Sequence, residues 1–253
     1  MTGSAWPRPA WRDSGARALV QWYVFGAFEP ELHVSGPQYR TRGTPAGAEV
    51  VRYPHEAIKS WSGYPLAGTL GRLFAGENRR LFERAGLARE CLILRGDFAD
   101  PADLDYLRDL VGTVTALVDL GGVAVVDPQM LSMFDPGEWR RRFFESEAFV
   151  ARNHIAILSS DDDTAPGRRR IHTRGMRKFA RPDIGIRNVP VEYAAHAGQL
   201  AERFAEFQAL GGIVEDGREI VLEGLSANMR ARHAGSLGDP EFNNVHLAIR
   251  WPD

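Results

Sequence analysis

Two Gly-Gly pairs constrain the architecture of this 253-residue chain more than any other feature. Gly121-Gly122 and Gly211-Gly212 each follow an amphipathic stretch with apolar residues at helical spacing, and each leads into β-branched residues. A helix that ends and reverses toward a sheet needs a residue with left-handed backbone angles, which glycine adopts at low cost. The pattern predicts two helices that end at these pairs, each followed by a strand within about three residues.

The segments 90–127 and 182–216 share one order: a short apolar strand, an amphipathic helix and a second strand. Asp100-Pro101 is typical of the N-cap and first-turn proline of the helix in the first segment. This order indicates an internal strand–helix–strand duplication, with units like those of ferredoxin-like folds. The alternative is that two helices merely end alike.

The remaining elements mingle strands and helices without strict alternation, which favours an α+β fold with an antiparallel or mixed sheet and helices packed on it. Residues 1–16 show no periodicity and predict a flexible N-terminus before a single α+β domain at 17–253. Further strands are expected at 19–25, 31–34, 49–53, 155–158, 218–223 and 245–251, two short helices within 70–87, and a helix from Asp135-Pro136 to about 149.

Composition points to a bacterial cytoplasmic protein. The 31 basic residues include only two lysines, Lys59 and Lys178, a bias that indicates a GC-rich genome. The single cysteine, Cys91, lies in an apolar run and is expected to be buried and unreactive, as in a reducing compartment. The first residues lack the apolar stretch of a signal peptide, and no run is long enough to cross a bilayer, so no membrane association is expected.

The most unusual segment is 168–181, which contains seven Arg or Lys residues and no acid although the formal net charge of the chain is only −2. Clustered guanidinium groups can bind phosphate or carboxylate oxygens, and a glycine at position 175 would let backbone N–H groups approach an anion. The segment therefore predicts an anion-binding site. Its candidate ligands are His172, Arg174, Arg177, Lys178 and Arg181.

A second interpretation needs no ligand. Asp161, Asp162 and Asp163 precede the basic segment and would balance its charge at a solvated hairpin tip. His154 and His172 flank this tip, and a hairpin would bring the two imidazoles close enough for acid–base chemistry or metal binding.

Common catalytic motifs are missing from the sequence. There is no phosphate-binding Gly-x-x-x-x-Gly-Lys loop, no Gly-x-Gly-x-x-Gly, no Gly-x-Ser-x-Gly and no His-Glu-x-x-His. We therefore assign no catalytic residue and expect neither a cofactor nor a bound metal. A pI near 6.4 and one basic segment also disfavour nucleic-acid binding.

The C-terminal part resembles a family of bacterial domains of unknown function. The resemblance rests on the run 171–179, on Pro182-Asp183-Ile184, and on Gly217-Arg218 before a last strand. It covers about the final 85 residues and departs from the family pattern at Ala180, where the family has glycine. The resemblance implies a noncatalytic role, such as an immunity-like or effector-associated interaction protein, and carries over no catalytic residue.

The function that the sequence favours is noncatalytic binding of a protein partner or a small anionic ligand. The alternative is a hydrolase or phosphoryl-handling enzyme that uses His154, His172 and the arginine-rich segment.

Overall fold

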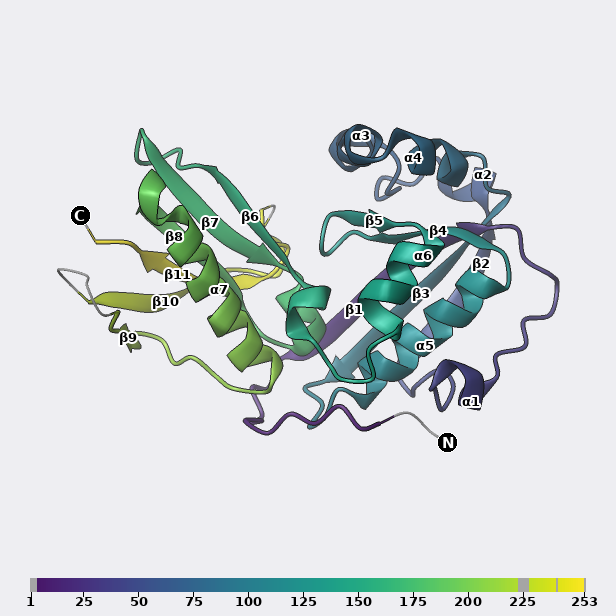
Figure 1. Ribbon diagram of the computed structural model, residues 1–253, viewed down its shortest axis with the longest axis horizontal. Coiled ribbons are helices and arrows are strands. Elements are labelled where there is room, and N and C mark those ends of the chain that lie inside the picture. Colours follow the sequence, from purple (N-terminus) through teal and green to yellow (C-terminus); the bar gives the residue numbers. More distant parts are fainter. Residues whose placement is uncertain (1–3, 223–227, 240, 253) are drawn as a thin grey trace. The chain divides into compact units, whose positions relative to one another are not determined.

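The computed structural model describes residues 4–222, 228–239 and 241–252, and the chain divides into two compact units (Figure 1). Unit 1 comprises Met1–Pro7, Leu19–Phe98 and Asp103–Phe149. Unit 2 comprises Arg8–Ala18, Ala99–Ala102 and Val150–Asp253. Each unit has its own sheet with helices packed on it, which confirms the α+β class.

The sheet of unit 1 has the strand order β2-β3-β1-β4-β5 and is antiparallel. Helix α5 connects β3 to β4 while β1 lies between these two strands, so the unit contains a split β-α-β arrangement. The strands are β1 (Arg17–Gly26), β2 (Ala48–Pro54), β3 (Glu90–Ala99), β4 (Gly122–Asp127) and β5 (Ser132–Phe134).

Helices cover both faces of this sheet (Figure 1). The hydrophobic core on one face joins Phe25 and Ile93 of the strands to Phe74 and Leu81 of α3 and α4, and Cys91 lies in it with no exposed surface. The predicted burial of Cys91 is confirmed. The helices are α1 (Gly36–Tyr39), α2 (His55–Ile58), α3 (Gly68–Glu77), α4 (Arg79–Gly86), α5 (Asp105–Asp119) and α6 (Pro136–Trp139), which continues as a π-helix over Arg140–Phe144.

The sheet of unit 2 is mixed, with the order β6-β7-β8-β11-β10-β9. Only the β8–β11 pair is parallel among the strand pairs of this sheet that the structure describes. The strands are β6 (Ala156–Asp161), β7 (Arg168–Arg174), β8 (Asp183–Pro190), β9 (Glu219–Ile220), β10 (Met229–Gly235) and β11 (Val245–Arg250). The helical segments are α7 (Ala194–Ala209) and 3₁₀ turns at Ala151–His154, Met176–Phe179 and Val191–Tyr193.

The two faces of the unit 2 sheet differ because side chains alternate along a strand. One face carries the buried apolar side chains of Ile171, Ile184, Ile186, Leu247 and Ile249, and α7 packs on it. The other, here called the open face, has no described helix packed on it. The side chains on this face belong to Arg170, His172, Arg174, Arg187, Arg230, Arg232, His246, Ala248 and Arg250, and Gly185 leaves a gap among them.

The first Gly-Gly pair behaves as predicted. Gly121 has a φ of 123° directly after α5, and β4 begins at Gly122. Gly211 also follows a helix end, with a φ of 99°, but the predicted strand at 213–216 is wrong. That segment instead lies along β10, where the Val214 carbonyl and the Asp216 carboxylate bind His233. The second half of the proposed duplication therefore lacks its last strand.

Three further expectations need correction. Asp100 does not cap α5, because the helix begins only at Asp105, with Leu104 at the N-cap; the Asp100 carboxylate instead binds Arg8 and Arg181. Residues 31–34 form no strand. The helix from Asp135-Pro136 starts as predicted, with the Asp135 side chain accepting from the Glu138 N–H, but it ends at Phe144. Two predictions stay predictions: a flexible segment at 1–16, in which Trp6 and Arg8 are buried, and a single domain at 17–253.

Candidate anion-binding surface

The basic segment sends its side chains in two directions. Residues up to Arg174 form β7, whose even-numbered side chains lie on the open face. The chain then turns at Gly175 and Ala180, which both have positive φ, with a 3₁₀ turn between them. Lys178 in this turn and Arg181 after it are both buried. The five candidate ligands therefore do not share one surface: His172 and Arg174 lie on the open face, whereas Lys178 and Arg181 are interior.

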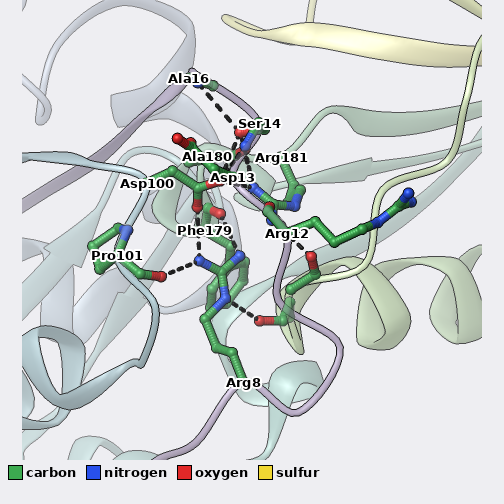
Figure 2. A network of polar contacts seen from close by, with 12 residues as sticks. Arg8, Arg12, Asp13, Ser14, Ala16, Asp100, Pro101, Phe179, Ala180 and Arg181 are labelled. Atoms are coloured by element: carbon green, nitrogen blue, oxygen red, sulfur yellow. Dashed lines mark hydrogen bonds and ion pairs between the residues drawn. The ribbon is translucent and has the colours of Figure 1, made fainter.

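Arg181 belongs to a buried network centred on Asp100, and Figure 2 shows its guanidinium and that of Arg8 pointing at the Asp100 carboxylate. Arg8 Nη1 lies 2.8 Å from Oδ1 and Arg181 Nη1 lies 2.6 Å from Oδ2. Ser14 donates to Oδ2 through both its backbone N–H and its hydroxyl. The other guanidinium N–H groups donate to the carbonyls of Pro101, Phe179 and Ala209 from Arg8, and of Arg12, Ala180, Gly211 and Gly212 from Arg181.

This network has the electrostatics of a structural charge cluster. Burial acts to raise the pKa of Asp100, but hydrogen bonds from Arg181, Ser14 and Arg8 outweigh it and lower that pKa. The Arg8 and Asp100 side chains are at most 1% exposed. Because neighbouring protein groups already occupy both guanidiniums, Arg181 connects the chain segments around it and has no donor turned toward solvent.

Lys178 is also held by the protein. Its ammonium group is fully buried and donates to the His154 carbonyl oxygen at 3.0 Å. The His154 ring packs edge-on against Phe179, with ring centroids 6.3 Å apart. Lys178 and His154 thus join the 3₁₀ turn at 176–179 to the one before β6.

On the open face, Phe242 lies over Gly185 and is surrounded by basic side chains. A Cβ atom at Gly185 would come within 3.1 Å of the Phe242 ring, so glycine makes the hollow that this ring fills. The His246 ring stacks on Phe242 at 4.0 Å, His172 meets it edge-on at 5.7 Å, and the Arg170 guanidinium lies over it at 5.3 Å.

The loop that carries Phe242 is tied to the strands by the same basic residues. Arg170 forms an ion pair with Glu241, Arg174 donates to the Glu241 carbonyl, and Arg177 donates to the Asn243 carbonyl. Burial, together with the charges of Arg170, Arg174 and Arg187, lowers the pKa of His172 to about 4. His172 is therefore neutral at pH 7.

A row of arginines crosses the neighbouring strands of the open face. The parallel register pairs Arg187 of β8 with Arg250 of β11, and the antiparallel register that pairs Ala231 with Ile249 puts Arg230 of β10 opposite Arg250. Asp162 and Asp163 neutralise Arg187. Arg230 and Arg250 are exposed, and neither makes an ion pair with an acid among the residues that the structure describes.

Sequence reasoning missed this row because its members come from three strands that are far apart in the chain. Arg187 and Arg250 are each the single arginine of their strand, so no local cluster marks them. The only available signal was the alternation of Arg230 and Arg232 along β10, a strand that the sequence did not predict.

The structure separates the two histidines of the enzyme hypothesis. Strands β6 and β7 do pair as a hairpin, but the register puts His172 opposite Leu158, four residues beyond His154. That separation is about 13 Å along the strand. Within residues 4–222, 228–239 and 241–252, no three His, Cys, Asp or Glu side chains are grouped so that they could hold a metal ion.

Comparisons with protein-family models, with curated proteins and with solved structures found no match to this chain. In the described part of the chain, no helix is both long and apolar enough to span a bilayer.

Proposed function

We propose that this protein is a noncatalytic binding protein that holds an anionic partner on the open face of the unit 2 sheet. The observation that carries the proposal is the pair Arg230 and Arg250. Continuing the β10–β11 register by one residue beyond Ala231–Ile249 puts the two side chains opposite each other on neighbouring strands. Both are exposed, and neither forms an ion pair with an acid among the described residues.

Such a pair is electrostatically unfavourable in the free protein. Like charges directly opposite each other in an antiparallel ladder repel, whereas a bound carboxylate or phosphate would interact with both guanidiniums at once. Glu219 lies on the other side of Arg230 in the ladder, but its carboxylate accepts from the Asn228 side chain at 3.1 Å. Glu219 offsets part of the Arg230 charge but none of the Arg250 charge, so an external anion gains most on the Arg250 side of the pair.

Several acids around the face are paired with its other arginines, among them Glu241 with Arg170. Asp162 and Asp163 bind Arg187 on one side, and Asp216 binds Arg232 on the other. The resemblance of about the final 85 residues to bacterial domains of unknown function also favours an interaction role for this part of the chain.

The test uses a glutamate decapeptide and inorganic sulfate as anionic probes, with binding followed by calorimetry and by the saturable rise in melting temperature. We expect the Arg230→Gln/Arg250→Gln variant to weaken peptide binding at least about tenfold, a change of about 1.4 kcal/mol. The control is Arg80→Gln/Arg203→Gln, which removes the same charge from exposed helix positions in α4 and α7.

Equal loss in the control would show that net charge alone attracts the peptide, and a nonsaturating response to both probes would show only charge screening. Either result would refute the proposal. The same measurement on Arg174→Gln/Arg177→Gln tests whether the basic segment extends the site as far as β7 and the adjoining turn.

A further inference from the structure

The two edges of the unit 2 sheet differ in whether other segments of the chain bind their backbone groups. At one end of the strand order, the short strand β9 and the segment 214–218 supply partners for β10. The Gly217 N–H donates to the Ala231 carbonyl, the Ala231 N–H donates to Arg218, and the His233 N–H donates to the Asp216 carboxylate. The opposite edge is β6, at the end of the strand order.

Alternate residues of β6 turn their backbone groups away from β7. Asp162 N–H donates to the Arg168 carbonyl, which fixes the even-numbered residues of this ladder as the hydrogen-bonded ones. The N–H and C=O groups of Ile157, Ser159 and Asp161 therefore point outward. Within the described chain, no group binds them.

The usual protections of an edge strand are missing from β6. Proteins commonly block such edges with proline, lysine or a bulge. The β6 sequence Ala-Ile-Leu-Ser-Ser-Asp contains neither proline nor lysine. Its pairing with β7 runs from Ala156 to Asp161 without a bulge. Ser159, Ser160 and Asp161 are exposed, while Ile157 and Leu158 are half-buried. A further strand could continue the sheet here.

The charge pattern around β6 identifies the strand that fits. Arg152 precedes the strand and donates to the Ile155 carbonyl at 3.0 Å, and Ile155 is itself extended. By the same alternation, that carbonyl points outward, so the guanidinium lies at the outer edge. At the other end, the Asp161 side chain is 93% exposed although Arg169 binds one of its oxygens. Glu202 of α7 lies 4.0 Å from the Arg152 Nε, at the limit of an ion pair, and the Arg152 side chain is still 43% exposed. The edge thus has an accessible cation near one end and an accessible anion at the other, which suits antiparallel pairing with an identical strand.

We propose that two copies of this chain pair through β6, antiparallel about a two-fold axis at Leu158. Ile157 of each copy then exchanges both backbone hydrogen bonds with Ser159 of the other, and the two Leu158 side chains face each other. In this register Asp161 of one copy lies opposite Ile155 of the other, beside the Arg152 guanidinium. The proposal is independent of the anion-binding proposal, since it uses the edge and not the open face.

Sedimentation of the full chain over a wide concentration range tests the proposal, with a reversible dimer expected. Asp161→Arg and Arg152→Asp should each raise the dissociation constant at least about tenfold, because each brings like charges together across the axis. The double variant exchanges the two charges and should return the constant to within about threefold of the original.

A second pair of variants tests the backbone contacts. Ser159→Pro removes an outward N–H without removing a β6–β7 hydrogen bond and should abolish the dimer, whereas Ser159→Ala keeps the N–H and should leave the dimer intact. Circular dichroism checks that both variants fold. A chain that is monomeric at all concentrations, or a dimer that neither Ser159→Pro nor the charge variants weaken, would overturn the proposal. The charge variants decide the question if Ser159→Pro does not fold.

Discussion

Unit 2 contains two groups of arginines that the protein handles in opposite ways. Around Asp100, Arg8 and Arg181 are buried, and carboxylate, hydroxyl and carbonyl oxygens surround their guanidiniums (Figure 2). On the open face, Arg230 and Arg250 are exposed and make no ion pair within the described chain. The contrast shows that a cluster of arginines in sequence or in space does not by itself define a binding site. What matters is whether the fold has already used their donors.

The buried group illustrates the requirement most clearly. Two guanidiniums share one carboxylate, so Asp100 compensates only part of the positive charge and backbone carbonyls accept the remaining donors. Burying an ion is tolerated only when its hydrogen-bonding groups are nearly all satisfied. The chain segments 8–14, 99–102, 179–181 and 209–212 are thereby fixed to one another around a single acid.

The largest expected effect comes from removing that acid. Asp100→Asn keeps the size of the side chain but leaves two buried guanidiniums without a counter-charge, and we expect it to lower the free energy of unfolding by about 3–5 kcal/mol. Urea titration measures this change. The control is Asp163→Asn, which removes an exposed carboxylate from Arg187 and should change stability little. Equal losses of stability in the two variants would show that the buried Asp100 carboxylate contributes no more to stability than an exposed one.

A smaller effect concerns the dependence of stability on pH, through a buried histidine of the open face. His172 lies beneath Phe242 on the open face, and its pKa is lowered to about 4 from an ordinary value near 6.5. The unfolded chain therefore binds the proton more tightly, so the stability that the neutral ring contributes is present above about pH 6.5 and is lost as the pH falls toward 4. The total is roughly 3 kcal/mol, at about 1.4 kcal/mol for each pKa unit.

Two variants that do not titrate, His172→Gln and His172→Phe, isolate this contribution. The unfolding free energy of the wild type should fall relative to both variants as the pH is lowered from 7 to 4, as measured by urea titration at each pH. If the wild type differs from both variants in the same way, the difference comes from protonation of the His172 ring, because Gln and Phe differ in shape but neither titrates. A wild-type profile parallel to both variants would mean that the His172 environment accepts the charged ring.

Much of the fold follows from local signals in the sequence. The β-branched run at 19–25 becomes β1, Asp135 caps α6, and Gly121 reverses the chain from α5 into β4, because each signal acts through neighbouring residues. The strand predicted at 213–216 fails for a tertiary reason. Val214 and Asp216 bind His233 of β10 through one carbonyl and one carboxylate, and only Gly217 and Arg218 bind the β10 backbone. The residues 213–216 therefore do not form a regular ladder.

The candidate site was harder to predict for the same reason. The sequence located the basic segment, and His172 and Arg174 do lie on the open face. Burial of Lys178 and Arg181 depends on a turn through Gly175 and Ala180 and on acceptors from distant segments, among them Asp100 and His154. The Arg187–Arg250–Arg230 row depends on strand order, which no local pattern specifies. Whether the five residues first proposed take part in anion binding stays a prediction.

The smallest expected effect concerns the exposed arginines of the open face, whose removal should not lower the free energy of unfolding. Arg250 faces Arg230 and Arg187 across the ladder, so Arg250→Gln removes repulsion and should raise the free energy of unfolding by about 0.2–0.5 kcal/mol at low salt. Salt screens charges at the surface, so this gain should disappear at about 1 M salt.

Arg203→Gln, on the exposed side of α7, is the control and should show no such salt-dependent gain. Urea titrations at the two salt concentrations measure both. If Arg250→Gln instead destabilised the protein by more than about 1 kcal/mol, Arg250 would be a structural arginine like Arg8 and Arg181, and the pair proposed to bind an anion would be reduced to Arg230.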